Sequence, residues 1–293
     1  MNKQLIAFAG FTAIMSGLLT ACAAPEDTQS EASSTTDSTG DASDPISREG
    51  IGILQIQANG EDFVRQGFVS KDGWAINFEH LYINLVEPTA YQTDPPFDPD
   101  GEGELQATAE AKLNESITVD LAEGDENADP IIVGEVSVPV GHYNALSWKM
   151  LPASDGAAAG STLVLIGTAQ KDGETIDFNI KLDPEYAYVC GEFVGDERKG
   201  VLTAGDTANI EATFHFDHIF GDGDAPADDA INTGALGFDP FATLASGNEL
   251  AVDMAMLEEQ LDQTQYRLLE ETVAGLGHVG EGHCLEVGSQ TSP

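Results

Sequence analysis

The sequence predicts a mainly β protein, an antiparallel β-sandwich with a small helical cap at its C-terminal end. From Gly50 onward, short segments alternate between apolar and polar residues with a period of two. The K-D-G sequences at residues 71–73 and 171–173 are typical of hairpin turns, because glycine tolerates a positive φ. Beyond Asp222 the alternation stops and helical spacing begins. Many short strands joined by such turns favour a sandwich or barrel, and we expect the sandwich.

The candidate strands follow one another from residue 51 to residue 216. They cover residues 51–57, 62–69, 74–85, 105–109, 116–121, 131–138, 142–151, 162–170, 174–182, 186–192 and 208–216. Within residues 74–85 the apolar side chains change face between Phe78 and Leu81. This change predicts a β-bulge at Glu79-His80.

Two segments near the C-terminus have helical spacing, residues 239–245 and residues 249–275. In the second, apolar residues from Leu250 to Val273 recur at intervals of three and four, and glycine follows at position 275. We therefore expect a sandwich domain at residues 50–222, followed at residues 223–293 by a helical cap and a tail rich in glycine and histidine.

The N-terminal segment predicts export and lipid anchoring. Residues 1–21 have a basic start, a short apolar core and small residues at the end, which is typical of a signal peptide. The following L-T-A-C sequence resembles the bacterial lipobox, which implies lipidation of Cys22. Residues 22–49 are mostly small and polar, and we expect them to be a disordered tether. Alanines 23 and 24 favour extracytoplasmic anchoring at the outer membrane.

The charge balance restricts the partners. The chain has 51 acidic and 11 basic residues, a formal net charge of −40. Such a field repels nucleic acid, so nucleic acid is excluded as an expected partner, and the lipid anchor is the expected contact with the membrane. The acidity is explained either by cation binding or by adaptation of the surface to salty water.

The cysteines predict one disulfide. If Cys22 carries lipid, only Cys190 and Cys284 remain, in a compartment that permits disulfides. We expect these two to pair.

A family resemblance supports the sandwich. The sequences T-V-D-L at residues 118–121 and V-S-V-P-V-G-H-Y at residues 136–143 resemble the V-D-L … P-x-G-x-Y pattern of an uncharacterised domain of bacterial lipoproteins. The resemblance extends over residues 50–151. It implies an Ig-like or prealbumin-like sandwich, and it implies no activity and no functional residues.

Histidines at two places in the chain predict a metal site. His215, Asp217 and His218 lie at the end of an expected strand, with His215 and Asp217 on its polar face, about 7 Å apart along the strand. Imidazole and carboxylate together suit zinc, copper or iron. His278 and His283 occupy a glycine-rich turn that the expected disulfide would fix beside the strands. We expect these five residues to bind one transition-metal ion.

Calcium is the competing metal. The acidic residues after the strand could supply oxygen ligands, and these residues are Asp217, Asp222, Asp224, Asp228 and Asp229. Their spacing does not match an EF-hand loop, and a solvated acidic loop explains them equally well.

The sequence predicts that the protein is not an enzyme, because it contains no G-x-S-x-G elbow, P-loop or dinucleotide-binding fingerprint after a strand. The expected function is metal capture, delivery or sensing by a lipoprotein anchored at the cell envelope. The alternative is a structural or adhesive surface module that binds a glycan or an envelope protein without a metal. Convergence of the two histidine clusters would favour the metal.

Overall fold

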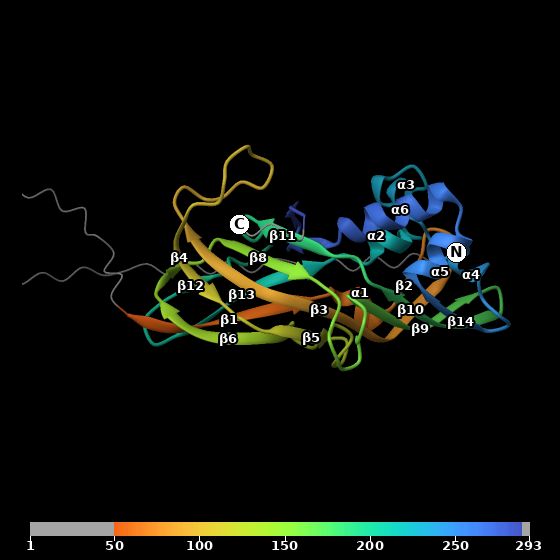
Figure 1. Cartoon of the computed structure of the whole chain (residues 1–293), viewed down its shortest axis with the longest axis horizontal. Helices are drawn as coiled ribbons and strands as arrows, with labels where there is room; N and C mark the ends of the chain where they lie inside the picture. The colour runs from red at the N-terminus through yellow and green to blue at the C-terminus, as the bar shows by residue number, and fades with distance from the viewer. Residues whose placement is uncertain (1–49, 289–293) are drawn as a thin grey trace, which may run out of the picture. The chain divides into compact units, whose positions relative to one another are not determined.

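The computed structural model describes residues 50–288, which form a mainly β structure with several sheets, consistent with the predicted β-sandwich (Figure 1). The expected signal peptide at residues 1–21, the lipidation site Cys22 and the tether at residues 22–49 lie outside the described residues. Within residues 50–288, no helix is long and apolar enough to cross a membrane.

The smaller of the two large sheets has five strands in the order β16-β15-β13-β1-β6. The strands are β1 (Ile51–Asn59), β6 (Ile131–Pro139), β13 (Thr207–Phe214), β15 (Gly277–Val279) and β16 (Gly282–His283). β1 runs antiparallel to β6 but parallel to β13, so this sheet is mixed, whereas the sequence predicted antiparallel pairing.

The larger sheet has ten strands. Its main order is β14-β10-β9-β3-β8-β11-β17, and β2, β4 and β5 also pair with β3. The strands are β2 (Phe68–Val69), β3 (Ala75–Thr93), β4 (Ala107–Lys112), β5 (Ser116–Asp120), β8 (Ala145–Met150), β9 (Leu163–Lys171), β10 (Glu174–Leu182), β11 (Tyr186–Cys190), β14 (Glu249–Asp253) and β17 (Leu285–Glu286). The register of β3 against β9 shifts between Phe78 and His80, which confirms the predicted bulge. A separate two-stranded sheet joins β7 (Gly141–His142) to β12 (Val201–Leu202).

Residues 62–69 do not form the single strand that the sequence predicted. They form helix α1 (Asp62–Gln66) and the short strand β2. Val64 is fully buried on the helix, and Gly67 ends it with a φ of 76°, a conformation that glycine adopts readily. A helix of five residues is too short to produce a helical period in the sequence, so its apolar residues match the alternation of a strand equally well.

The core lies between the two large sheets. Leu54 and Ile56 of β1 and Phe214 of β13 are buried from one side, and Trp148 of β8 and Tyr188 of β11 are buried from the other. The ring centroids of Trp148 and Phe214 are 5.7 Å apart, which brings the two sheets into direct contact. Burial of such large aromatic side chains contributes strongly to folding.

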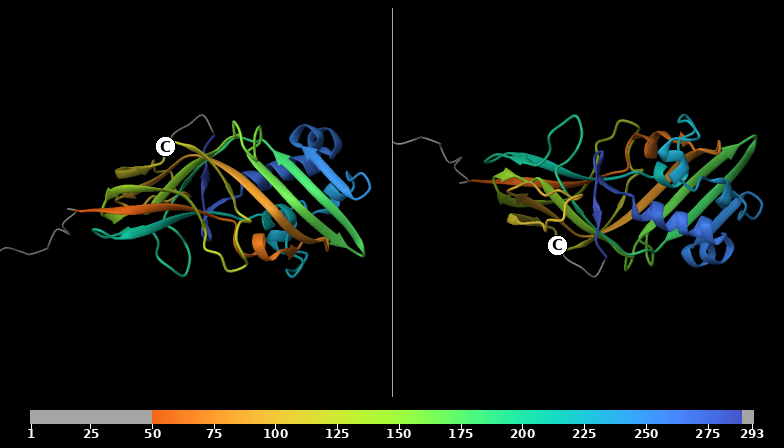
Figure 2. Two further views of the ribbon diagram at one scale, coloured as in Figure 1. Left: turned by 90° about the horizontal axis from the view of Figure 1, so that it is seen from below. Right: turned by 90° about the horizontal axis from the view of Figure 1, so that it is seen from above.

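The helices of the C-terminal third gather at one end of the sheets, beside β9, β10 and β14 (Figures 1 and 2). They are α2 (Asp217–Phe220), α3 (Ala230–Gly234), α4 (Asp239–Ala242), α5 (Met254–Gln260) and α6 (Gln263–Ala274). A second aromatic cluster packs α2 and α4 against the larger sheet, and its members include Phe78, Phe178, Phe216, Phe220, Phe238 and Phe241.

The helix predicted at residues 249–275 is divided into three elements. Residues Glu249–Asp253 form β14, which pairs in parallel with the edge of β10. The side chain of Asp253 caps α5, and Asp262 caps α6 through a reciprocal capping box with Gln265. An N-cap aspartate favours the start of a new helix. Asp253 and Asp262 therefore divide the segment of helical spacing into separate elements.

The end of the described chain crosses from one sheet to the other. β15 and β16 extend the five-stranded sheet, and β17 pairs with β11 of the ten-stranded sheet. Cys284 lies between β16 and β17 and forms the predicted disulfide with Cys190 at the end of β11. The disulfide therefore holds the crossing segment to the larger sheet.

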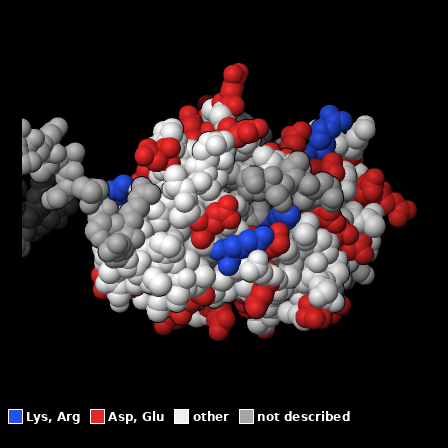
Figure 3. Space-filling model, turned by 60° about the vertical axis from the view of Figure 1, so that its left-hand side comes forward, with Lys and Arg blue, Asp and Glu red and all other residues white. Residues whose placement is uncertain are grey.

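The surface is acidic, as the composition requires. In the face drawn in Figure 3, acidic side chains are scattered and basic ones are few. On this face the acidity is not confined to one patch, and with only 11 basic residues in the chain a local gathering of lysines is unusual.

Candidate metal centre

Four histidines from distant parts of the chain converge at one place. The ring centroids of His215 and His278 are 4.4 Å apart, and those of His278 and His283 are 4.6 Å apart. The His218 ring lies 5.3 Å from that of His215 and 5.2 Å from that of His278. The structure thus brings together the two histidine clusters that the sequence singled out.

The end of β13 places His215 and His218. The strand stops at Phe214, and the chain then turns directly into the single helical turn of α2. The amide of His218 donates to the carbonyl of His215 at 3.2 Å, so the turn folds His218 back beside His215. Asp217 therefore begins α2 and does not continue the strand, contrary to the expected alternation.

The polar face of β13 is buried. Glu211, Thr213 and His215 are 3%, 1% and 7% exposed, although a solvent-facing polar surface was expected. β15 pairs with the end of β13, with His278 opposite Thr213. β15 thus extends the sheet beside β13, and Gly280 in the turn after it bonds to the side chains of Thr213 and His215, whereas Glu211 is bonded to Asn59 and Lys199. The strand pattern alone does not contain this tertiary arrangement.

A tight hairpin places His278 and His283 across from each other. β15 and β16 pair antiparallel, with His278 opposite His283 and only Gly280-Glu281 between the strands. Gly280 has a φ of 61°, and a side chain at this position would collide with the carbonyl oxygen of Val194. Glycine is therefore required at this turn.

Backbone carbonyls hold one ring nitrogen on each of three histidines. Nε2 of His215 lies 3.2 Å from the Gly280 carbonyl oxygen, and Nδ1 of His278 lies 3.2 Å from that of Leu276. The His218 ring makes a hydrogen bond to the backbone of Gly275. When a ring N–H donates to a carbonyl, the other nitrogen keeps a free lone pair, which is the usual arrangement of a metal-binding histidine.

Two carboxylates lie against the imidazoles. One ligand atom each of His215, Asp217 and His218 lies within 4.8 Å of the others, and this is the one such group found in residues 50–288. Oδ1 of Asp217 is buried and accepts no hydrogen bond from the described chain. An acceptor buried in this way is costly unless a donor or cation satisfies it.

The second carboxylate, that of Glu61, was not among the residues that the sequence analysis singled out. Its Oε2 lies 3.3 Å from Nδ1 of His215, about the separation of two ligand atoms on one tetrahedral ion. Glu61 has φ 63° and ψ 175°, a region of backbone space used almost exclusively by glycine. Such strain persists where a side chain must be held in place. One glutamate among 51 acidic residues carries no sequence signal.

Burial favours the neutral form of two of the imidazoles, those of His218 and His278. Desolvation, together with the nearby His215, lowers the pKa of His278 to about 3. Desolvation also lowers the pKa of His218, against the attraction of Asp217. Desolvation raises the pKa of Glu61, although His215 opposes the shift. Neutral imidazole is the form that binds metals, so His218 and His278 need lose no proton to do so near neutral pH.

The side chain of Thr213 holds the turn of the β15–β16 hairpin in place. Its hydroxyl accepts a hydrogen bond from the buried amide of Gly280 at 2.8 Å. We expect Thr213→Val to leave this amide unsatisfied, to destabilise the fold by about 1–3 kcal/mol and to weaken metal binding about 10-fold. Chemical denaturation and metal titration measure the two effects. Thr207→Val, at the exposed start of β13, is the matched control, and equal affinities of the two variants would contradict this role of Thr213.

In the acidic loop after α2, two of the carboxylates accept hydrogen bonds from nearby backbone amides. Asp222 accepts the amide of Asp224, and Asp229 caps α3 by accepting the amide of Ile231. Asp224 and Asp228 are exposed, and among the described residues these acids form no metal-binding group with one another. The loop geometry therefore adds no support for calcium.

The other two histidines lie outside the cluster. Nδ1 of His80 is 2.7 Å from Oδ2 of Asp120, and the His80 ring stacks on Tyr82. His142 is paired with Arg198 and Glu192. These two provide natural controls for the four gathered histidines.

Comparison with known proteins does not assign the chain to a family. No protein-family model, no curated protein and no solved structure matches the chain. The function is therefore argued from the site alone.

Proposed function

We propose that this protein binds one transition-metal ion at the cluster of His215, His218, His278 and His283. The observation that carries the proposal is the set of carbonyls of residues 275–280, which hold one ring nitrogen on each of three imidazoles. Gathering four imidazoles and two carboxylates at partly or wholly buried positions costs free energy that apolar side chains would avoid, so packing for stability alone does not account for the cluster.

The ligand set follows from the nitrogens that remain. His215 offers Nδ1 beside Glu61, His278 offers Nε2, and His218 offers the nitrogen directed away from Gly275, with Asp217 adjacent. His283 is exposed at the rim and can complete the set. Ligand atoms up to 4.8 Å apart must approach by about 1 Å to share one ion.

The donors favour zinc, copper or iron over calcium. Imidazole nitrogen suits these transition metals, whereas calcium requires six to eight oxygen ligands. The cluster contributes more imidazoles than carboxylates. A calcium site of that coordination number has no counterpart among these residues.

The biological role is metal capture, delivery or sensing by a non-enzymatic lipoprotein at the cell envelope, anchored through Cys22 to the outer membrane. The signal-like N-terminus and the L-T-A-C sequence support this location. Exposure of His283 gives the ion a route to solvent or to a partner. The Ig-like or prealbumin-like kinship of the sandwich belongs to the same proposal and rests on the residue 118–143 resemblance.

Elemental analysis tests the proposal. The untagged unit Ile46–Pro293, which is compact by itself, is treated with a chelator and dialysed against trace zinc, copper and iron. We expect about one equivalent of one of these metals to remain bound. A protein that retains none of the three would contradict the proposed function.

A further inference from the structure

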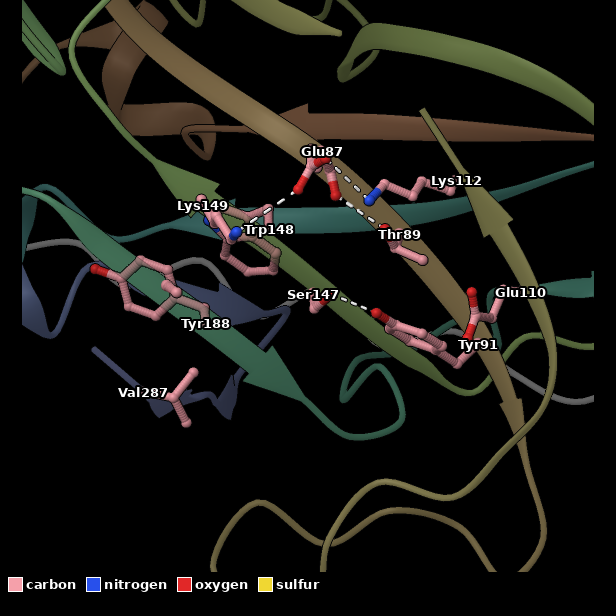
Figure 4. A pocket seen from close by; sticks show the side chains of 11 residues that line it. Glu87, Thr89, Tyr91, Glu110, Lys112, Ser147, Trp148, Lys149, Tyr188 and Val287 are labelled. Atoms are coloured by element: carbon pink, nitrogen blue, oxygen red, sulfur yellow. Dashed lines mark hydrogen bonds and ion pairs between the residues drawn. The ribbon is translucent and has the colours of Figure 1, made fainter. Parts of the chain in front are cut away.

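A second site lies on the outer face of the ten-stranded sheet, away from the histidines. It is a cavity of about 140 Å³ that crosses β4, β3, β8 and β11 and reaches Val287 after β17 (Figure 4). Its polar lining consists of Glu87, Thr89, Tyr91, Glu110, Lys112, Ser147 and Lys149. None of the residues of the histidine cluster lines it.

Strand register brings these side chains to one face. Tyr91 lies opposite Glu110 and Thr89 opposite Lys112 in the β3–β4 pair. Thr89 also lies opposite Ser147 in the β3–β8 pair. Because directly paired residues project to the same side of a sheet, the side chains form one continuous polar surface.

Glu87 is turned onto this face by a strained bulge. The β3–β8 register shifts between Val86 and Thr89, and Glu87 has a φ of 52°. Its carboxylate contacts Lys112 at 3.0 Å and Lys149 at 3.6 Å. Glu61 and Glu87 are two of the three non-glycine residues with positive φ in residues 50–288, and the third, Asp172, occupies a hairpin turn where this conformation is usual. Strain outside a turn commonly marks a functional position.

The floor and walls offer both donors and acceptors. The hydroxyls of Tyr91 and Ser147 are 2.9 Å apart, and their mutual bond uses only one of the two protons. Lys112 and Lys149 supply ammonium donors, and Glu110 supplies an exposed carboxylate acceptor. Ala187, Val287 and the Tyr91 ring add apolar surface. A few convergent polar groups on a partly apolar surface define a small-molecule site.

Charge selects a neutral ligand. The net charge of −40 repels small anions from the whole molecule. A cation would meet the two ammonium groups of Lys112 and Lys149, which already share the Glu87 carboxylate. The hydroxyls, ammonium groups and carboxylates that line the cavity therefore favour a neutral molecule that both donates and accepts hydrogen bonds.

We propose that this cavity binds a single neutral sugar ring. Ring hydroxyls donate to Glu110 and accept from Lys112 and from the Tyr91–Ser147 pair, while the carbon face of the ring lies on Tyr91 and Ala187. The cavity of about 140 Å³ has room for about one sugar ring, so the ligand is a free monosaccharide or the terminal residue of a glycan.

Ligand-observed saturation-transfer NMR tests this assignment on the unit Ile46–Pro293. The panel consists of glucose, galactose, mannose and N-acetylglucosamine, each as the free sugar and as its methyl glycoside. We expect at least one to bind with a dissociation constant of about 1 mM, the order reached by so small a ligand. Equal binding of the methyl glycoside identifies a terminal glycan residue, and preference for the free sugar identifies a monosaccharide. No binding by any panel member at ten times that concentration overturns the proposal.

Variants locate the binding. Lys112→Met and Ser147→Ala each weaken the sugar about 10-fold, since each removes one hydrogen bond in the cavity. Lys181→Met, an exposed lysine on β10, is the matched control and leaves binding unchanged. Thermal melts verify that each variant is folded. Unchanged binding in both cavity variants, or tighter binding of sodium gluconate than of every neutral sugar, overturns the assignment.

Discussion

Replacement of His215 and His218 together by alanine is expected to weaken metal binding by about 100-fold or more. Loss of a single outer-shell partner of a metal ligand typically lowers affinity 10–100-fold, and this variant removes two direct ligands. Both side chains are wholly or partly buried, and their ring centroids are 5.3 Å apart. Isothermal titration with zinc, copper(II) and iron(II) measures the change.

His80→Ala is the control for that experiment. His80 is partly exposed and is paired with Asp120 on β5, so its loss leaves the cluster intact. We expect its metal affinity to equal that of the native protein. An equal loss of affinity in His80→Ala and in the double variant would show that the histidines bind metal nonspecifically. Native affinity in the double variant would show that the cluster does not bind the metal.

Loss of the Cys190–Cys284 disulfide is expected to have the largest effect on stability. The bond joins residues 94 positions apart, and the chain-entropy model assigns a loop of this length about 4–5 kcal/mol. Cys284 directly follows His283 and connects β16 to β17. The Cys190→Ser/Cys284→Ser variant should therefore lose both stability and metal affinity, as measured by urea denaturation and metal titration.

Comparison with Thr213→Val distinguishes the effect of the disulfide on stability from its effect on metal affinity. That variant destabilises the fold moderately through the Gly280 amide but keeps the disulfide. If metal affinity in the cysteine variant falls no further than in Thr213→Val, the disulfide stabilises the chain without positioning His283. A free energy of unfolding equal to that of the native protein would contradict the role of the bond altogether.

Local patterns predicted the features of the fold that depend on neighbouring residues. The period of two in β9 and β10 and the change of face at Glu79 each arise from side chains of one strand, and both predictions are confirmed. The disulfide was predictable because only two cysteines remain outside the L-T-A-C sequence at residues 19–22. The parallel pairing of β1 with β13 was not predictable, since it joins segments some 150 residues apart.

The candidate site likewise has some residues that local sequence patterns predict and others that depend on tertiary packing. The sequence singled out the histidines because four of the six lie in two short clusters. It could not indicate Glu61, because its position beside His215 results from tertiary packing and an unusual backbone conformation. It could not indicate burial of the polar face of β13 either, since Gly280, which bonds to Thr213 and His215 there, comes some 60 residues later.

X-ray absorption at the edge of the bound metal tests the central claim most directly. For the loaded protein we expect at least three nitrogen or oxygen ligands at about 2.0–2.1 Å, with outer-shell scattering from two or more imidazole rings. The ligands would be His215, His218 and His278, with Asp217 or Glu61 adjacent. A spectrum with only oxygen ligands and no imidazole scattering would place the metal on the acidic surface and contradict the proposed centre.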